Sequence, residues 1–177
     1  ASQQCIPVAD LPGNTCADAV ELGPAPVSFE GETLNATNDF SFPAGACPGD
    51  YVGEGAASND RVHVFTAATA GVYTFVLEAT FDSLLVVASL CGDIGSSCLG
   101  AHDTLGLETV TASLVAGEKA YVVVDGWSNI DNPVGEYTLT VLEPCVPSCD
   151  GKLCGDDGCG ASCGDCPGGE YCSQVGQ

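Results

Sequence analysis

The sequence contains no methionine and very few basic residues. Its only cations are Arg61, Lys119 and Lys152, against 24 aspartates and glutamates, and the formal net charge over 177 residues is −21. A nucleic-acid groove needs clustered cations for the phosphates, and an anionic membrane surface attracts proteins through the same kind of cluster. Charge therefore disfavours both partners. A chain that lacks methionine and begins at Ala1 is expected to be a mature secreted protein whose signal peptide has been removed.

Long apolar runs and amphipathic helical patterns are also missing. No apolar run approaches the roughly 20 residues that a spanning helix needs, so we expect no membrane span. Cysteine, in contrast, is abundant, with 12 residues in the chain. Twelve cysteines in a processed chain without a membrane span predict an oxidising, extracellular compartment and a disulfide framework. The acidity either serves solubility alone or is partly neutralised by bound divalent cations, and the two interpretations are compatible.

Short β-rich runs separated by turn residues dominate the middle of the sequence. They predict strands at residues 61–66, 71–79, 83–90, 107–114, 120–125 and 136–142, with a Gly/Ser loop at 91–103. Upstream, edge strands are expected at 27–29 and 33–36 around a turn at Gly31, and one helical turn at 17–22. This spacing predicts an all-β fold, an antiparallel β-sandwich of jelly-roll type.

Residues 119–142 form the stretch around which we expect the sandwich to be organised. Residues 120–125 are β-branched and apolar on both faces, which predicts a central strand. Residues 136–142 alternate apolar and polar side chains, as in a strand with one buried face. We expect the two strands to form a hairpin that closes the sandwich. The loop between them crowds carboxylate and amide oxygens together, so it either repels itself or holds a cation.

Calcium is the cation that such a loop predicts, because Ca²⁺ takes six to eight oxygen ligands in flexible geometry. The ligand spacing approaches that of an EF-hand, but Ile130 stands where the loop needs glycine and the flanks are strands, so it is not an EF-hand. The alternative is that aspartate and asparagine are simply good turn formers. The candidate ligands are Asp125, Asn129, Asp131 and Glu136, with Asp60 and Asp82 at the same end of the sandwich.

Composition changes sharply at Pro144. We expect an N-terminal arm at residues 1–15, the sandwich at 16–143 and a cystine-rich module at 144–177, which has too few aliphatic residues to bury a core. This module contains seven of the twelve cysteines: Cys145, Cys149, Cys154, Cys159, Cys163, Cys166 and Cys172. Its Cys163-Gly-Asp-Cys166 motif could mimic a zinc or redox site, but the secreted context favours structural disulfides.

Sequence proximity suggests two disulfides within the sandwich. Cys91 and Cys98 bracket a short loop and are expected to pair, and Cys16 is expected to pair with Cys47. Cys5 is then left with the seven cysteines of the tail, an even number, so we expect Cys5 to be bridged to the tail. The connectivity within the tail cannot be deduced from spacing.

Six runs of the sandwich region follow a recurring pattern: Asn59-Asp-Arg-Val-His-Val-Phe-Thr66, Ala70-Gly-Val-Tyr-Thr-Phe75, Phe81-Asp-Ser-Leu-Leu-Val-Val87, Leu90-Cys-Gly92, Ala116-Gly-Glu-Lys-Ala-Tyr-Val-Val-Val-Asp-Gly126 and Gly135-Glu-Tyr-Thr-Leu-Thr-Val141. In these runs, residues 14–143 resemble the secreted bacterial pre-peptidase C-terminal type of domain, at the level of a family. That resemblance implies a non-catalytic jelly-roll, often calcium-dependent and sometimes a binder of proteins or polysaccharides; this chain departs from the family's setting because it has no peptidase domain. The tail, with its closely spaced cysteines from Cys149 to Cys166, resembles short cystine-rich repeats of secreted bacterial proteins.

Catalytic signatures are weak in this sequence. His63 alternates with Phe65 in a strand, which predicts half-buried packing, and His102 lies in a loop. No Gly-x-Ser-x-Gly or His-Glu-x-x-His motif occurs, so we expect a protein that is not an enzyme. Trp127 is a candidate for stacking on a sugar ring, with covering of the core as the alternative. Asn35 begins a glycosylation sequon.

Two functions fit these observations best. The first is a calcium-stabilised structural subunit of an extracellular filament, sheath or surface matrix, in which residues 1–15 could add to a neighbour's sheet edge. The second is a calcium-dependent module for adhesion to carbohydrate or protein, within a larger secreted protein. The expected partners are therefore other copies of the chain, other extracellular proteins or polysaccharide. A hydrolase is the least favoured class.

Overall fold

The computed structural model describes residues 11–42, 45, 47, 58–127, 133–145, 149–155, 162–164 and 172. The chain divides into two compact units, Ala1–Glu143 and Pro144–Gln177. In the described ranges, no helix has the length and apolar character needed to cross a membrane. Each unit is considered by itself below.

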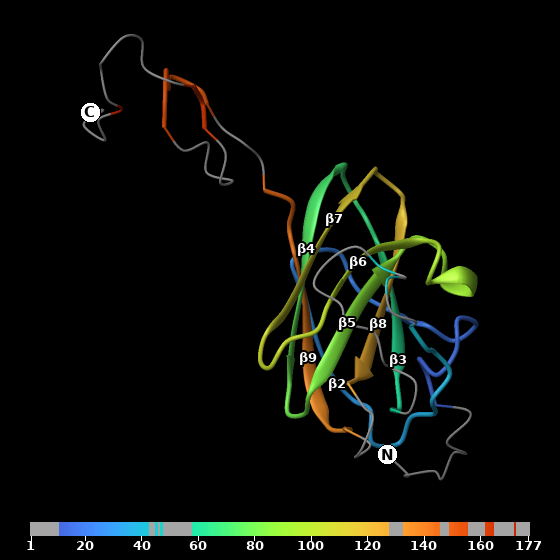
Figure 1. Ribbon diagram of the computed structural model, residues 1–177. Coiled ribbons are helices and arrows are strands. Elements are labelled where there is room, and N and C mark those ends of the chain that lie inside the picture. Colours follow the sequence, from blue (N-terminus) through green and yellow to red (C-terminus); the bar gives the residue numbers. More distant parts are fainter. Residues whose placement is uncertain are drawn as a thin grey trace, which may run out of the picture. The chain divides into compact units, whose positions relative to one another are not determined.

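The first unit is a β-sandwich of two sheets (Figure 1). Every strand pairing is antiparallel except that of β1 with β3. The prediction of an all-β, predominantly antiparallel sandwich is therefore confirmed. The five-stranded sheet has the order β1 (Val20–Glu21), β3 (Arg61–Thr66), β8 (Lys119–Gly126), β5 (Ser83–Ala88) and β6 (Cys98–His102); the four-stranded sheet has the order β2 (Val27–Glu32), β9 (Glu136–Leu142), β4 (Gly71–Ala79) and β7 (Glu108–Leu114).

The two sheets differ in how many of their faces are buried. In β4, β7 and β9 buried and more exposed residues alternate, so the four-stranded sheet has one buried face. All six residues of β5 are buried, because the five-stranded sheet is covered on both faces. One face packs against the other sheet around Phe65, Phe75 and Leu139. The opposite face carries a second cluster, here called the outer core, which includes Phe42, Val62, Leu84, Val86, Ile94 and Val123.

Most strands lie where alternation predicted them. Strands β3, β4 and β9 have the expected bounds, and β8 is the middle strand of its sheet, as its apolar run predicted. Three local predictions were wrong. Residues 17–22 contain the short strand β1 instead of a helical turn, residues 33–36 form no strand, and strand β6 lies within the expected 91–103 loop, after a 3-10 helix, η2 (Cys91–Asp93).

Gly31 is the reason why the edge-strand prediction failed. It lies within the continuous strand β2, opposite Tyr137 of β9. A Cβ atom at Gly31 would lie 2.5 Å from the Tyr137 ring. The glycine therefore makes room for an aromatic ring on the neighbouring strand, and it does not mark a turn.

The expected hairpin of the two strands in residues 119–142 was also wrong. Strand β8 lies between β3 and β5, whereas β9 lies between β2 and β4 in the other sheet. Each strand already has neighbours on both edges, so the two cannot pair with each other. The chain crosses between the sheets after β8. Local alternation could not reveal this, because it reports which face is buried and not which strand is the partner.

The disulfides of the sandwich also differ from the expected pairs. Cys16 is bonded to Cys91 and Cys47 to Cys98, with Cα–Cα distances of 5.6 and 5.3 Å. The β5–β6 connection is held by its own hydrogen bond from Ser89 N to Ser97 O, and its two cysteines bond outward to the N-terminal part of the chain. The sequence separations are 75 and 51 residues, so both bonds cross-link distant parts of the chain.

Two further disulfides lie in the second unit, Cys149–Cys163 and Cys154–Cys172. Cys163 is thus part of a disulfide, which argues against its use in a redox or zinc motif. Four disulfides among the described residues indicate that the chain folds in an oxidising compartment. The expected bridge from Cys5 to the tail falls outside the described residues, as do Cys159 and Cys166.

Candidate functional site

Two aspartates are buried on the outward face of the five-stranded sheet. Asp125 of β8 lies opposite Leu84 of β5, a residue of the outer core. Arg61 at the start of β3 pairs with Val124, so continuation of this antiparallel register places Asp60 opposite Asp125. Both aspartates are fully buried. The fold therefore brings together two of the predicted metal ligands.

Several oxygen atoms at this aspartate pair lack hydrogen-bond donors. Asp60 accepts hydrogen bonds at Oδ2 from the backbone N–H groups of residues 39 and 40, each at 2.8 Å. Asp125 accepts one at Oδ1 from Gly126 N at 2.7 Å. The other oxygen of each carboxyl, and Oγ of Ser58, are buried without a partner in the described part of the chain. Buried polar atoms are rarely left so, because each one costs free energy.

The electrostatics of the pair favour the addition of positive charge. Burial raises the pKa of Asp60 to about 7. Burial, together with the negative charge of Asp60, raises the pKa of Asp125 to about 9. Without a cation, at least one of these carboxyls holds a proton at neutral pH. A bound cation would restore both charges, because it replaces the solvation that burial removes.

The donor atoms at this pair suit calcium. The unpartnered atoms are carboxylate and hydroxyl oxygens, the hard ligands that Ca²⁺ selects. Gly126, next to Asp125, is closely surrounded. A Cβ atom added at Gly126 would lie 2.3 Å from Pro133 O and 2.9 Å from Ser58 Cβ, so there is room only for glycine. Among the described residues no group of three or more His, Cys, Asp or Glu side chains is arranged to hold a metal. The described part thus supplies two carboxylates and not a full ligand set.

The other predicted metal ligands do not complete a site in the described part of the chain. Asp82 lies at the same end of the sheet as Asp125, where its carbonyl accepts the Trp127 N–H at 2.9 Å. Asn129 and Asp131 fall outside the described residues. Asp82 lies near Asp103, whose pKa rises to about 6 because of burial and the negative charges of Asp82 and Glu108. Glu136 is on the outward face of β9, in the other sheet.

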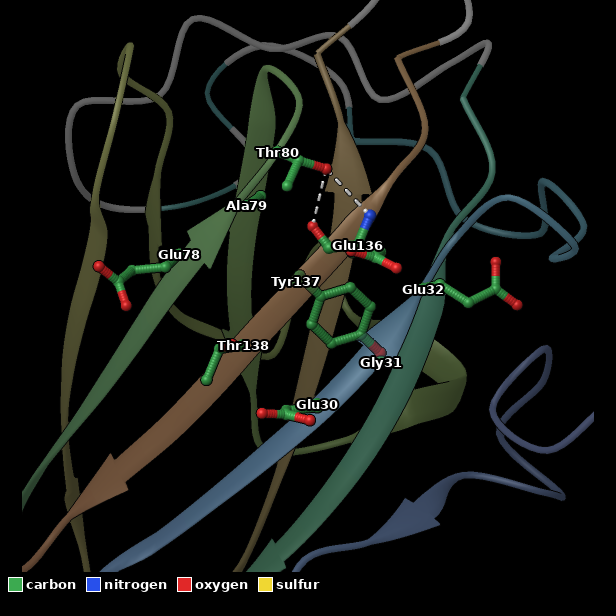
Figure 2. Close-up of a pocket in the computed structure, with 9 residues that line it drawn as sticks. All are labelled: Glu30, Gly31, Glu32, Glu78, Ala79, Thr80, Glu136, Tyr137 and Thr138. Atoms are coloured by element: carbon green, nitrogen blue, oxygen red, sulfur yellow. Dashed lines mark hydrogen bonds between the residues drawn. The ribbon is translucent and has the colours of Figure 1, made fainter.

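Glu136 belongs to a hollow that the sequence did not reveal, here called the glutamate hollow (Figure 2). Its volume is about 610 Å³, and Glu30, Glu32, Glu78 and Glu136 line it from strands β2, β4 and β9. Glu32 and Glu136 are direct cross-strand partners, an arrangement of like charges that weakens a sheet. Alternation in 27–32 could have shown that Glu30 and Glu32 share a face, but their grouping with Glu78 depends on strand order.

A second hollow, here called the edge pocket, lies where the edge strands of the two sheets approach each other. Its volume is about 330 Å³, and both edge strands, β1 and β2, contribute to it. It is lined by Pro12, Val20, Phe29, Gly31, Glu32, Arg61, His63 and Tyr137. The walls are mostly apolar, and the polar residues among them are Glu32, Arg61, His63 and Tyr137.

The histidines take up different structural roles. His63, predicted to be half-buried packing, is fully buried, and its Nε2 lies 2.8 Å from the Tyr137 hydroxyl. Burial, and then the charge of Arg61, lowers the pKa of His63 to about 3, so the ring stays neutral. His102 ends β6, and its Nδ1 lies 2.5 Å from Oε2 of the buried Glu108.

Trp127 and Asn35 are both accessible. Trp127 is 37% exposed and donates its backbone N–H to the Asp82 carbonyl at 2.9 Å. Asn35 is exposed and donates from its backbone nitrogen to Glu32 Oε2 at 3.0 Å. Sugar stacking at Trp127 and glycosylation at Asn35 stay predictions.

No protein-family model matches the sequence, and no curated protein matches it. Among solved structures, the chain is similar to the pre-peptidase C-terminal domain of a collagenase from Bacillus anthracis, with a TM-score of 0.45 and 17% identity, over 70% of this chain and 93% of that one. It is also similar to PliG of Aeromonas hydrophila, a periplasmic inhibitor of g-type lysozyme, with a TM-score of 0.40 and 12% identity, over 70% and 96%.

A third similar structure is a GH26-CBM35 β-(1,4)-mannanase from Podospora anserina, with a TM-score of 0.31 and 17% identity, over 68% of this chain and 29% of that one. The first of the three carries the name of the family that the sequence resembles. None of them is close enough to assign the chain to a family.

Proposed function

We propose that this protein is a non-enzymatic extracellular module, stabilised by calcium and stapled by disulfides, that serves as a structural subunit of a filament, sheath or surface matrix. The observation that carries the calcium part is the buried Asp60–Asp125 pair with its unpartnered oxygens. Asp60 and Asp125 would hold the ion. Asn129 and Asp131, in the loop that follows Trp127, would complete its ligands.

The structural role is supported by charge and by cross-linking. A chain with a net charge of −21 repels its own copies at low ionic strength, and bound calcium would reduce that repulsion. The two long-range disulfides tie the N-terminal part of the sandwich to the β5–β6 connection. Such cross-links suit a protein that must persist in an oxidising environment without chaperones.

A second candidate function is a module that binds carbohydrate or protein. The partly exposed Trp127 and the glutamate hollow favour it, since an aromatic surface and carboxylates are the groups that contact sugar rings and hydroxyls. This function requires no assembly, and calcium would then stabilise a monomer.

Negative-stain electron microscopy of the purified protein, in calcium and then in excess EGTA, separates the two functions. Filaments or sheets that disperse on chelation would support the structural subunit. Monodisperse particles in both conditions would exclude assembly and favour the binding module, which a glycan array with wild type and Trp127→Ala would then test. The double variant Asp60→Asn, Asp125→Asn is the control, because it should behave in calcium as wild type does in EGTA.

A further inference from the structure

Strand β2 has an open backbone edge. Thr33 N donates to Gly135 O at 2.9 Å, so residues 33 and 135 form a hydrogen-bonded pair. In an antiparallel ladder, hydrogen-bonded pairs alternate with pairs that are not hydrogen-bonded. Gly31 and Phe29 therefore point their backbone N–H and C=O groups toward β9. The N–H and C=O groups of Ser28, Glu30 and Glu32 point the other way, out of the sheet. The hydrogen bond from Arg61 Nε to Glu32 O, at 3.1 Å, agrees with this direction.

Within the described part of the chain, nothing pairs with the outward backbone groups of Ser28 and Glu30. Strand β2 is the end strand of its sheet, and no hydrogen bond from the described residues reaches these two backbone groups on that side. Proteins usually protect an open edge with lysine, proline or a bulge. Strand β2 itself contains no lysine, proline or bulge, and its six residues pair with β9 in an unbroken register. Its charged side chains are Glu30 and Glu32, so a like-charged strand is repelled and a basic one is attracted.

Two different surfaces flank this edge. On the inner side Phe29 and Gly31 line the mostly apolar edge pocket, with Arg61 and Tyr137 among its polar residues. On the outer side Glu30 and Glu32 line the glutamate hollow (Figure 2). A strand added beside β2 would alternate its side chains between these two surfaces, because successive residues point to opposite faces.

We propose that the β2 edge is a docking site for an extended, basic segment of another extracellular protein. The segment would pair its backbone with Ser28 and Glu30, place lysine or arginine over the glutamate hollow, and insert one aromatic side chain into the edge pocket. In strand addition the backbone supplies affinity and the pockets supply specificity. This inference rests on the proposed function in one respect, that the chain binds other molecules outside the cell.

Charge complementarity selects this occupant over a second copy of the chain. A strand opposite Glu30 and Glu32 places its outer side chains about 5 Å from the carboxylate-bearing residues, so cations are favoured there, above all opposite Glu30, because Glu32 already has Arg61 at 3.6 Å. This chain has only Arg61, Lys119 and Lys152, and no two of them are two residues apart. It cannot supply alternating cations, whereas a basic partner can.

The polar side chains that line the edge pocket narrow the aromatic residue to tyrosine. Glu32, Arg61 and Tyr137 line the pocket beside its apolar residues. A volume of about 330 Å³ accommodates one large side chain. A tyrosine would present its ring to the apolar walls and its hydroxyl to these polar groups.

The test uses fluorescein-labelled synthetic peptides and fluorescence anisotropy with the full chain. The probe alternates lysine with valine and has a central tyrosine on the valine side. We expect it to bind wild type, to weaken as salt rises, and to bind a few-fold more tightly than its phenylalanine analogue. A scrambled peptide of equal composition that binds as well would overturn the proposal, because attraction would then come from charge alone.

Variants locate the binding on the chain. Glu30→Pro removes one edge donor without disturbing the pairing with β9, and should weaken binding by about tenfold. Glu30→Gln keeps that donor and should cost about twofold to threefold. Glu143→Gln, beyond the other end of β9, should bind as wild type does. Val20→Trp, which fills the edge pocket, should remove the preference for tyrosine.

Three further results would overturn the proposal: no binding of the probe, equal binding to wild type and Glu30→Pro, or self-association in sedimentation velocity that Glu30→Pro abolishes. The last would make a second copy the occupant. Electron microscopy of Glu30→Pro keeps the two proposals separate. Calcium-dependent filaments from a variant that no longer binds the probe would show that assembly does not use this edge, and leave the proposed function intact.

Discussion

At the residue scale, His63 shows how burial sets a side chain's chemistry. It packs edge-on against Phe29, with ring centroids 4.8 Å apart, and contacts the Tyr137 hydroxyl. A neutral imidazole costs far less to bury than a charged one. Its role in the core is therefore compatible only with the neutral form, and this has a consequence for stability in acid.

We predict that His63 makes the fold sensitive to acid. Its pKa falls from an ordinary 6.5 to about 3 in the folded state. Between these two values the imidazole is protonated in the unfolded chain and neutral in the folded chain. Stability from this group is present above pH 6.5 and lost as pH falls toward 3. Between pH 6 and 4 the loss should be about 2 kcal/mol.

The measurement is urea unfolding of wild type and His63→Gln across that pH range, with His102→Gln as the control. The substitution destabilises at every pH, but the gap between wild type and His63→Gln should narrow as pH falls. A gap that does not change with pH would show that His63 keeps its ordinary pKa.

Glu136 allows a second prediction at this scale. It faces Glu32 directly across β2 and β9, and the nearest cation to Glu32 is Arg61, at 3.6 Å. Removing one of two like charges that face each other should stabilise the sheet. We expect Glu136→Gln to raise the free energy of unfolding by about 0.5 kcal/mol in low salt, with a smaller gain in high salt. A loss of stability in calcium would instead indicate that Glu136 helps to hold the ion.

At the element scale, the disulfides act on the connection between β5 and β6. Both bonds join it to the N-terminal part of the chain, which covers the outer core. Cross-links across 75 and 51 residues restrict the unfolded chain far more than the short Cys91–Cys98 link that sequence proximity suggested.

We predict that the double variant Cys47→Ala, Cys98→Ala is less stable than wild type by about 4 kcal/mol, which is the chain-entropy effect of a loop of this length. Thermal or urea unfolding measures it. A matched double variant, Cys149→Ala, Cys163→Ala, lies in the other unit and should leave the sandwich transition unchanged. A small loss from the first variant would mean that the outer core holds the N-terminal part without the bond.

At the scale of the whole molecule, the large negative charge and the buried aspartates point to the same requirement. The described part of the sandwich buries two carboxylates next to each other, and the chain as a whole carries 24 acids against three bases. Bound divalent cations would relieve both the local and the global repulsion.

We predict that calcium stabilises the folded chain through the Asp60–Asp125 pair. Saturation at about 100 times the dissociation constant should add about 2.7 kcal/mol to the free energy of unfolding. Differential scanning calorimetry in calcium and in EGTA measures the shift in Tm. Asp125→Asn should lose most of that shift while changing Tm little in EGTA at pH 7, where burial keeps this carboxyl protonated.

Glu143→Gln is the control for that experiment, since it removes one exposed charge. Equal calcium shifts in wild type and Asp125→Asn would place calcium at another site. No shift in wild type would remove calcium from the proposed function, and leave the buried pair as a protonated structural feature.

The sequence by itself determined the class of fold and much of the strand layout. Strands β3, β4 and β9 follow from alternation, and the central place of β8 follows from its run of β-branched residues. These features depend on which face of a segment is buried, a property that the spacing of apolar residues along the chain reports directly.

Only the tertiary structure decided which segments meet. It placed β8 and β9 in different sheets, paired Cys16 with Cys91, and grouped Glu30 with Glu78. It also set Asp60 opposite Asp125, whereas sequence reasoning expected those residues only at one end of the sandwich. Strand order, register and disulfide pairing are set by contacts between residues far apart in the chain. Local periodicity does not report such contacts.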